Sequence, residues 1–308
     1  MKLLILLSTM FFFKISYAQE IITIYSPYSP SHSGTPAMLR ILEQANNSQE
    51  NFNFRLIFKP GGEQILAIKE MDKSPENSLA IIAPKYVEHT VSSKLDRKNY
   101  VPVHALGDAC WAVISNLGDE SVGVSSLKGN SEIVVGGVGF GNAAHLTGLQ
   151  LGEKFDFKVR YIVFKSNFDA LLLMASNGSI NLVLERPVNY ENLKTKSPNL
   201  KLLGLSCPTN DTRYPNVKTI KEQGVITPFV FNITISNKSM PASKRDGISK
   251  ILNQATISVG KDEIKKLSDM IPPIFSNVSI EDYYSNTVSL LEKLIDHHRE
   301  SINKSIKK

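Results

Sequence analysis

The sequence predicts an α/β protein, and two patterns along the chain indicate this fold class. Short runs of β-branched and apolar residues recur, and each run is typical of a strand. Several of them are separated by segments whose apolar residues are spaced three and four positions apart, as in a helix. This alternation is typical of largely parallel sheets with helices packed against them. The predicted strands are 21–25, 54–58, 79–83, 111–115, 132–135, 158–164, 180–184, 202–205 and 229–235.

Residues 1–18 have the pattern of a secretory signal peptide. Lys2 precedes an apolar stretch that is shorter than a membrane-spanning helix requires and that Lys14 interrupts. Ser16 and Ala18 are the small residues expected just before a cleavage site. We therefore expect cleavage after Ala18 and an exported protein.

The size and charge of the chain narrow the class of partner. The chain has 308 residues, which is enough for two domains of ordinary size. Its formal net charge is +6, of which Lys2 and Lys14 contribute part, so the exported chain is only mildly basic. The sequence contains no dense basic patch with interleaved aromatic residues, so a nucleic-acid partner is not expected. A mild positive charge favours the attraction of small acidic solutes.

The two cysteines, Cys110 and Cys207, leave two alternatives open. In an oxidising, exported compartment they would be free to pair, but they lie far apart in the sequence. Free cysteines are among the most frequently buried residues, so two buried thiols are the preferred interpretation. Neither cysteine has the spacing of a zinc site or of a redox motif.

Four segments carry an apolar face and are predicted to be helices that pack against the sheets. Ser279 and Asp282 have the spacing of a capping box at the start of the last helix. The predicted faces are Met38, Ile41, Leu42 and Ala45; Phe168, Leu171, Leu172 and Ala175; Ile248, Ile251, Leu252 and Ala255; and Ile280, Tyr284, Val288, Leu291 and Ile295.

Two loops between a strand and a helix are the candidate binding elements. In the loop 26–36, Thr35 is the predicted N-cap and Pro36 the first helical residue. In the loop 136–146, Asn142 is the predicted N-cap. Free backbone N–H groups at a helix N-terminus bind anions, and ligands of open α/β sheets lie at the carboxyl ends of the strands. The two loops therefore predict a site for a small anion.

Other classes of site have weaker support. Residues 139–144 match G-x-G-x-x-A, but the following strand, 158–164, ends without an acidic residue for a ribose, so no nucleotide cofactor is expected. None of the six histidines has a metal-ligand spacing, so no metal site is expected. Ser31, His32 and Ser33 are adjacent, and catalytic triads are recognised by geometry, so a hydrolase stays open as the alternative.

Six segments, in order, resemble motifs of the substrate-binding proteins of tripartite tricarboxylate transporters, also called Bug proteins. The resemblance spans most of the chain after residue 18. Residues 25–40 are similar to P-F-P-P-G-G-G-T-D-x-x-A-R, 59–65 to R-P-G-A-G-G-x-I, 100–103 to F-x-P-V, 137–146 to G-x-G-S/T-x-x-H-L, 163–169 with 178–182 to V-P-Y-x-G…G-x-V/I-D, and 213–224 to R-x-P-x-V-P-T-x-x-E-x-G.

The resemblance implies a type II periplasmic-binding-protein fold, in which two α/β lobes enclose a ligand cleft. The first lobe is expected to comprise residues 19–120 and 235–308, and the second lobe residues 121–234. The implied function is that of a monomeric periplasmic receptor, which captures a small carboxylate metabolite for a membrane transporter of the tripartite type or for a sensor. Such a receptor is not an enzyme and needs no cofactor. The alternative is an exported hydrolase-like α/β enzyme with its site in the same cleft.

The resemblance also implies which residues hold the carboxylate, mostly through backbone amides and small hydroxyls. Here Ser31-His32-Ser33 replaces three glycines and Pro36 replaces an aspartate, so a narrower pocket or a different ligand is expected. His145 has a second interpretation as a packed, internally hydrogen-bonded residue. The predicted ligand-binding residues are Ser31, His32, Ser33, Gly34 and Thr35; Gly139, Phe140, Gly141, Asn142, Ala143 and His145; and Lys165, Ser166, Asn167, Asp169 and Glu185.

Overall fold

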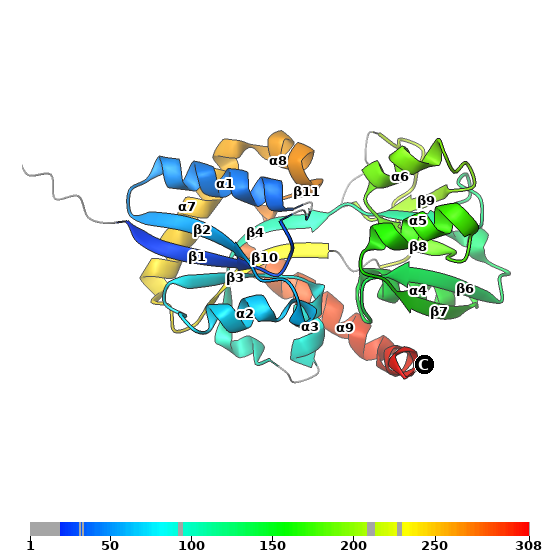
Figure 1. Ribbon diagram of the computed structural model, residues 1–308, viewed down its shortest axis with the longest axis horizontal. Helices are drawn as coiled ribbons and strands as arrows, with labels where there is room; N and C mark the ends of the chain where they lie inside the picture. The colour runs from blue at the N-terminus through cyan, green and yellow to red at the C-terminus, as the bar shows by residue number, and fades with distance from the viewer. Residues whose placement is uncertain are drawn as a thin grey trace, which may run out of the picture.

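The computed structural model of the protein describes residues 19–307, except 31, 33, 92–94, 208–212 and 227–229. The predicted signal peptide therefore lies outside the described residues. Within them, the chain forms two α/β lobes, each built on one sheet. Strand β4 runs from the first lobe towards the second, and the antiparallel strand β10 runs back into the first (Figure 1).

The first lobe is built on a six-stranded sheet within the described residues, in the order β11-β4-β10-β3-β1-β2. Strand β1 pairs in parallel with β2 and β3, whereas β10 is antiparallel to both β3 and β4. The strands are β1 (Glu20–Ser26), β2 (Phe52–Phe58), β3 (Ser78–Ile82), β4 (Tyr100–Ala109), β10 (Val230–Asn237) and β11 (Met270–Ile271).

The second lobe is built on a five-stranded sheet of described residues, in the order β7-β6-β8-β5-β9. Strand β6 pairs in parallel with β7 and β8, and β5 is antiparallel to β8 and β9. The strands are β5 (Ala112–Ser115), β6 (Glu132–Gly137), β7 (Lys158–Val163), β8 (Leu182–Glu185) and β9 (Lys201–Leu205).

Helices cover both faces of each sheet. Helices α1, α7 and α8 contribute to one apolar cluster of the first lobe, and α2, α3 and α9 to the other. The α-helices are α1 (Thr35–Ser48), α2 (Leu66–Met71), α3 (Pro84–Val91), α4 (Ala143–Phe155), α5 (Asn167–Asn177), α6 (Pro187–Lys194), α7 (Ala242–Val259), α8 (Lys261–Ser268) and α9 (Ile280–Ile306). The 3-10 helices are η1 (Gly62–Gln64), η2 (Arg97–Asn99), η3 (Val124–Leu127) and η4 (Pro273–Ser276).

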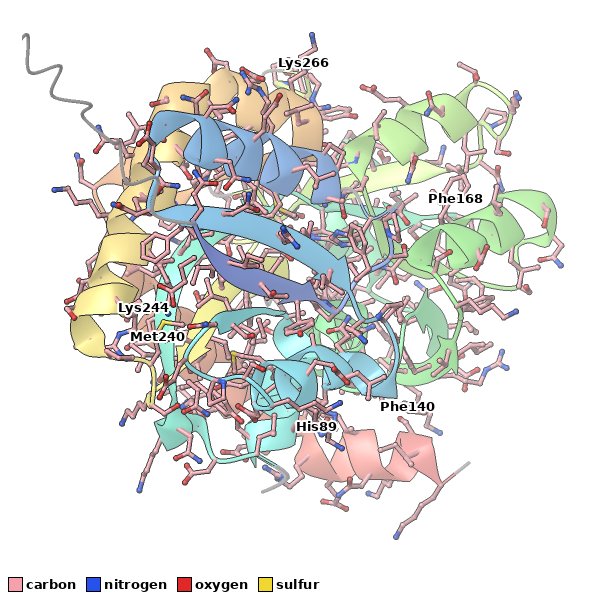
Figure 2. The ribbon with its side chains drawn as sticks, turned by 60° about the vertical axis from the view of Figure 1, so that its left-hand side comes forward. His89, Phe140, Phe168, Met240, Lys244 and Lys266 are labelled. Carbon is pink, nitrogen blue, oxygen red and sulfur yellow. A yellow bond between two sulfur atoms is a disulfide. The ribbon has the colours of Figure 1, made fainter. Side chains whose placement is uncertain are left out.

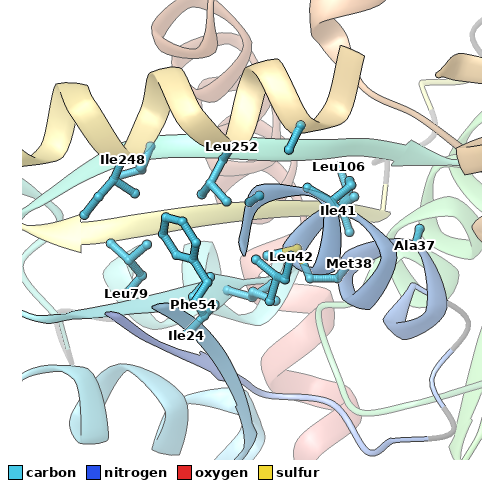
Figure 3. Close-up of a cluster of buried hydrophobic side chains, with 14 of the residues drawn as sticks. Ile24, Ala37, Met38, Ile41, Leu42, Phe54, Leu79, Leu106, Ile248 and Leu252 are labelled. Carbon is cyan, nitrogen blue, oxygen red and sulfur yellow. The ribbon is translucent and has the colours of Figure 1, made fainter. Parts of the chain in front are cut away.

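The core of the first lobe confirms the predicted helix faces of α1 and α7. Met38, Ile41 and Leu42 of α1 are buried in one cluster with Ile248 and Leu252 of α7. Figure 3 shows these side chains directed towards each other over the strands. Each fully buried aliphatic side chain contributes about 1.5–3 kcal/mol to the hydrophobic stabilisation of the fold.

The predicted face of α5 is wrong in part. Phe168 and Leu172 are 36% and 41% exposed, and the buried residues of this helix are Ala170, Leu171 and Met174. Figure 2 shows Phe168 at the surface of the second lobe. The helix is rotated because Ala170 packs against Gly136, where an added Cβ would lie 2.7 Å from the Cβ of Ala170.

The two glycines at the end of β6 therefore serve helix packing. At Gly137, an added Cβ would lie 2.8 Å from the Cβ of Ala144 in α4. Such separations are shorter than van der Waals contact, so only glycine lets α4 and α5 approach the sheet this closely. In contrast, Gly139 and Gly141 in the loop beyond have φ angles of +72° and +71°, which glycine adopts without strain.

The sequence pattern did not predict β4, and the sheets are more mixed than expected. Pro102 and Gly107 interrupt the strand pattern of β4. Its pairing with β10 also shifts register at two places, between Asn232 and Ile233 and between Thr234 and Ile235. The nine predicted strands all exist, but the pairs made by β4, β5 and β10 are antiparallel.

Cys110 and Cys207 form a disulfide, with their Cα atoms 4.4 Å apart, so the preference for two buried thiols is wrong. The register of the second sheet explains the pairing. Ala112 of β5 faces Leu205 of β9 in an antiparallel pair. Continuing this register by two residues beyond each strand places the two cysteines opposite each other. Sequence separation alone carried no information about this register.

Candidate ligand-binding site

The loop between β1 and α1 presents two stacked aromatic rings. The rings of Tyr28 and His32 are parallel, with centroids 3.7 Å apart. The Gly34 N–H donates to Nδ1 of His32 at 3.1 Å. Burial and, to a smaller extent, the charge of Arg186 lower the pKa of His32 to about 4. His32 is therefore neutral at pH 7, and because Nδ1 accepts a hydrogen bond, Nε2 carries the proton and is a donor.

The start of α1 differs from the prediction. Gly34 is the N-cap and Thr35 is the first helical residue, because the Gly34 carbonyl accepts from the Met38 N–H at 3.2 Å. The Thr35 hydroxyl donates to the Ser29 carbonyl at 3.4 Å, within the same loop. Both Gly34 and Thr35 are buried. The two other predicted residues of this loop, Ser31 and Ser33, lie outside the described residues.

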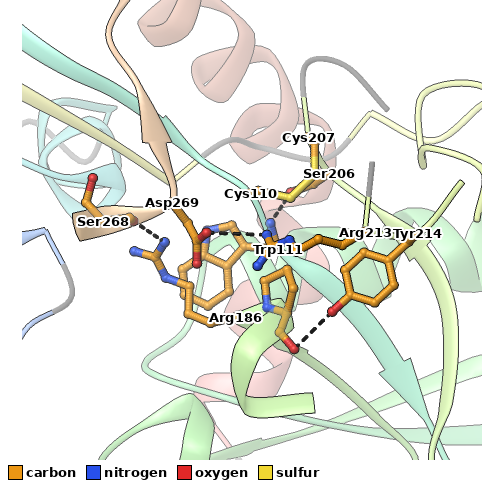
Figure 4. Close-up of a disulfide and its surroundings, with 10 residues drawn as sticks. Cys110, Trp111, Arg186, Ser206, Cys207, Arg213, Tyr214, Ser268 and Asp269 are labelled. Carbon is orange, nitrogen blue, oxygen red and sulfur yellow. Dashed lines mark hydrogen bonds and ion pairs between the residues drawn. A yellow bond between two sulfur atoms is a disulfide. The ribbon is translucent and has the colours of Figure 1, made fainter. Parts of the chain in front are cut away.

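Arg186 brings a positive charge of the second lobe close to this loop. It follows β8 directly, is only 5% exposed, and donates from Nη1 to the Ser268 carbonyl at the end of α8 in the first lobe at 2.7 Å. Its guanidinium also lies 5.3 Å from the centre of the Trp111 ring (Figure 4). Tyr28 and His32 both experience the charge of this guanidinium. The side chains of the two lobes therefore meet at Arg186.

The predicted residue Glu185 supports the loop that carries Arg186. Its Oε1 accepts from the Arg186 backbone N–H at 2.6 Å and from Asn189 at 3.2 Å. Burial raises the pKa of Glu185. Burial lowers the pKa of Arg186, and the charges of Asp269 and Glu185 raise the Arg186 pKa to a smaller extent. Burial thus disfavours the charged form of both side chains.

Two buried donors near Arg186 have no hydrogen-bond partner within the described part of the chain. They are the hydroxyl of Tyr28 and the indole Nε1 of Trp111. A buried donor without a partner costs about 1–3 kcal/mol, which a ligand that accepts from it recovers. The backbone of Trp111 is held in place, since its N–H donates to Ser206 Oγ at 3.0 Å and its carbonyl accepts from the Ser206 N–H at 2.8 Å. Together with Arg186, these groups form a positively charged set of donors that suits a carboxylate.

The predicted loop 139–143 is held by contacts within its own lobe and to α3 and α9. Asn142 is the N-cap of α4, as predicted, and its Oδ1 accepts from the His145 N–H at 3.0 Å and the Tyr161 hydroxyl at 3.1 Å. A Cβ at Gly141 would lie 3.6 Å from Glu88 and 3.9 Å from Ile302. Phe140 packs edge-on against His145, and Ala143 is buried at the start of α4. Figure 2 shows Phe140 close to α9.

His145 is fully buried and packed, which is the second interpretation of this residue. Its Nδ1 accepts from the Gly141 N–H at 3.1 Å, its ring stacks on Tyr161 at 4.2 Å, and Nε2 lies 3.5 Å from Ser305 Oγ. These contacts fix the shape of the loop 139–143. Direct ligand contact by His145 stays a prediction.

The last group of predicted residues lies between β7 and α5. Ser166 is the N-cap of α5 and accepts from the Asp169 N–H at 3.0 Å. Asn167 accepts from the Val138 N–H at 3.2 Å, which ties this turn to the loop 139–143. Lys165 and Asp169 are exposed. The structure thus joins His32 and Glu185 around Arg186, and separately joins Asn167 to the loop 139–143.

The sequence interpretation missed Arg186, Trp111 and Tyr28. One signal was present for Arg186, because it stands at the carboxyl end of a buried strand and directly before Pro187, the first residue of a helix. This is the position at which open α/β sheets bind ligands. Trp111 had no comparable signal, since its role depends on the crossover between β4 and β5, which places it next to Arg186.

Compared by sequence, the chain matches no protein-family profile and no curated protein. By structure it is similar to a TctC solute-binding protein from Polaromonas, with 16% identity, a TM-score of 0.68, and coverage of 90% of this chain and 98% of the other. It is also similar to the periplasmic binding protein BugD, with 15% identity, a TM-score of 0.64, and coverage of 94% of this chain and 98% of the other. A third similar structure is MatC from Rhodopseudomonas palustris with bound malate, with 14% identity, a TM-score of 0.65, and coverage of 89% of this chain and 98% of the other.

These similarities show the fold. The chain has the two-lobed α/β fold of the periplasmic binding proteins, and the expected fold class is confirmed. Among the described helices, we find none with the length and apolar character that a membrane span requires.

Proposed function

We propose that the protein is an exported receptor that binds a small carboxylate solute between its two lobes, with Arg186 as the principal anchor. The observation that carries this proposal is the buried guanidinium of Arg186. It lies near donors of Tyr28 and Trp111 that have no hydrogen-bond partner among the residues that the structure describes. A carboxylate accepts from several such donors at once. The structurally similar MatC, which carries bound malate, supports a carboxylate as the ligand class.

A binding role is better supported than the hydrolase alternative. A general base needs a pKa near the working pH, whereas the pKa of His32 is lowered to about 4. Nδ1 of His32 is also occupied by the Gly34 N–H, so this ring is arranged as a neutral donor. A neutral donor stabilises a bound carboxylate and does not activate a nucleophile.

The arrangement explains how binding would be reported to a partner. Tyr28 and His32 belong to the first lobe, Arg186 to the second, and Trp111 to the crossover between the two sheets. A ligand that contacts all of them gains its full interaction energy only when the lobes are closed, so it shifts the population towards the closed form. We propose that this form, in the periplasm and as a monomer, is recognised by a membrane transporter of the tripartite type or by a sensor.

The predicted residues outside the Arg186 group complete this proposal. Gly34 and Thr35, with the backbone of residues 139–143 and the turn 165–169, would contact the remainder of the ligand. In the structure these segments follow the carboxyl ends of β1, β6 and β7. Ligands of open α/β sheets lie at such ends.

Thermal-shift measurements on residues 19–308 test the proposal directly. The panel contains mono-, di- and tricarboxylates, amino acids and aromatic acids, with sugars and nucleotides as controls. A ligand at 100 times its Kd stabilises the fold by about 2.7 kcal/mol, which is readily measured. We expect a saturable shift with at least one carboxylate. If no acid gives a shift after the protein has been refolded to remove any carried-over ligand, the proposal is wrong.

Replacing Tyr28 by phenylalanine is expected to weaken binding without destabilising the free protein. The Tyr28 hydroxyl has no hydrogen-bond partner in the described structure, so its removal loses no contact in the absence of ligand. In the complex, the missing donor should lower affinity by about 5- to 150-fold, equivalent to about 1–3 kcal/mol. Calorimetric titration with the carboxylate found in the panel measures this change.

Tyr100→Phe is the matched control, because the Tyr100 hydroxyl donates to Asp72 at 2.9 Å, in another part of the first lobe. This variant should lose stability and keep its affinity. Equal affinities of Tyr28→Phe and the unmodified protein would remove Tyr28 from the site.

A further inference from the structure

A second cluster of ligand-type side chains lies where α4 of the second lobe meets α9 of the first (Figure 1). Glu153 of α4 and the adjacent His297 and His298 of α9 each present one ligand atom, and these three atoms lie within 4.8 Å of one another. The Glu153 carboxylate oxygens are 2.9 and 3.2 Å from Nε2 of His297. Glu153 and His297 are 144 positions apart in the sequence, which is why no metal-ligand spacing was visible there.

Apolar packing holds the two helices together at this place. Leu146 of α4 is fully buried in the same cluster as Leu294, Ile295 and Ile302 of α9. The side chains of Glu153 and His297, each 59% exposed, lie beside this contact. The helices therefore fix the positions of the three ligand residues, while the exposed pair keeps the rotamer freedom to adjust.

His298 provides an independent indication of a ligand. It is only 6% exposed, and its Nε2 is buried without a hydrogen-bond partner among the residues described. A buried imidazole nitrogen is a common ligand of transition-metal ions.

The cluster also opens onto a groove of about 1100 Å³. Glu153, His297 and His298 line it together with Tyr161 of β7 and Ser301 of α9. A groove of this volume gives an ion access to the cluster and leaves room for water molecules to complete its coordination shell.

We propose that Glu153, His297 and His298 bind one divalent first-row transition-metal ion, such as Zn²⁺, that joins the two lobes. Two imidazoles and one carboxylate are a donor set that zinc uses when a further position is left for water. Ligand atoms at about 2.1 Å from a tetrahedral ion are roughly 3.4 Å apart, so the Glu153–His297 separation already fits and the cluster needs to contract only slightly. The alternative is a simple ion pair between Glu153 and His297, without a metal.

The test is calorimetric titration of ZnCl₂ into the chain 19–308, produced without a histidine tag and dialysed against EDTA, with MgCl₂ as the hard-ion comparison. We expect one Zn²⁺ per chain and no Mg²⁺ binding. Substitution of groups that hydrogen-bond to metal ligands lowers metal affinity by about 10- to 100-fold. Loss of a ligand itself, in Glu153→Gln or in His297→Gln/His298→Gln, should therefore lower Zn²⁺ affinity by at least about 100-fold. Zn²⁺ should also raise the Tm of the unmodified protein and not of these variants.

Glu300→Gln is the matched control, because Glu300 lies on the same helix, pairs with Lys304 at 2.6 Å, and changes the charge equally. This variant should bind Zn²⁺ normally. The proposal is overturned by absence of stoichiometric Zn²⁺ binding, by retention of binding in the double histidine variant, or by an equal loss in Glu300→Gln. Because Glu153→Gln changes an exposed side chain, it keeps the test valid even if the double variant fails to fold. The proposal is independent of the carboxylate site.

Discussion

Replacing Arg186 by methionine is expected to lower the affinity for the carboxylate ligand by about 30-fold or more. Removing one partner of a buried, hydrogen-bonded charge pair costs about 2–5 kcal/mol, and each 1.4 kcal/mol corresponds to a factor of ten. We place Arg186 in this range because it is 5% exposed. Within the described structure, its neighbours Tyr28 and Trp111 each retain a buried donor without a partner. Methionine keeps much of the apolar stem and removes the charge. Calorimetric titration with the carboxylate from the panel measures the loss.

Arg186→Lys distinguishes charge from geometry. Lysine keeps the positive charge but lacks the planar fork that binds a carboxylate with two parallel hydrogen bonds and stacks on an aromatic ring. The guanidinium of Arg186 lies 5.3 Å from the Trp111 ring centre and donates to the Ser268 carbonyl. We expect the lysine variant to bind more weakly than the native protein and more tightly than the methionine variant.

Arg213→Met is the control for this series. Arg213 pairs with Asp269 at 3.3 Å, so it belongs to the same charged neighbourhood, but its side chain is 36% exposed. Exposed ion pairs contribute little, at most about 1 kcal/mol. The affinity of Arg213→Met for the carboxylate should therefore differ from that of the native protein by less than about fivefold. If Arg213→Met and Arg186→Met weaken binding equally, the effect is one of general charge and Arg186 is not the anchor.

Removing the disulfide between Cys110 and Cys207 is expected to give the largest change in stability. The bridge closes a loop with a sequence separation of 97 residues. In the chain-entropy description, a crosslink over about 100 residues lowers the entropy of the unfolded chain enough to stabilise the fold by about 4.7 kcal/mol. Urea unfolding of the native protein should therefore move to lower denaturant concentration in the presence of a reductant.

The disulfide also supports the candidate site, which gives the same experiment a second readout. Cys110 directly precedes Trp111, and Cys207 directly follows Ser206, whose backbone and side chain both bond to the Trp111 backbone (Figure 4). We expect Cys110→Ala/Cys207→Ala to lose ligand affinity as well as stability. This double variant should not respond to the reductant, which controls for effects of the reagent itself. If the unfolding curves of the native protein coincide with and without reductant, the prediction is contradicted.

Local signals in the sequence determined most of the secondary structure. Short apolar runs that alternate with helical segments predicted nine strands that the structure contains. The capping residues Asn142 and Ser279 begin helices as expected. These features depend on interactions within a few residues, such as a side chain that accepts from a nearby backbone N–H. Where local rules compete with packing, the prediction was wrong, as at Phe168 and Leu172, because the small Gly136 and Ala170 set how α5 rotates onto the sheet.

The sequence by itself thus determined the order of nine strands and the fold class, and it predicted the loops near which a ligand would bind. Only the tertiary structure decided which distant residues meet. The register between β5 and β9 pairs the cysteines, and the crossover that carries Trp111 places it over Arg186. The packing of α4 on α9 brings Glu153 to His297. Periodicity and capping are local and visible along the chain, whereas a site depends on strand order, register and crossovers, which no local pattern encodes.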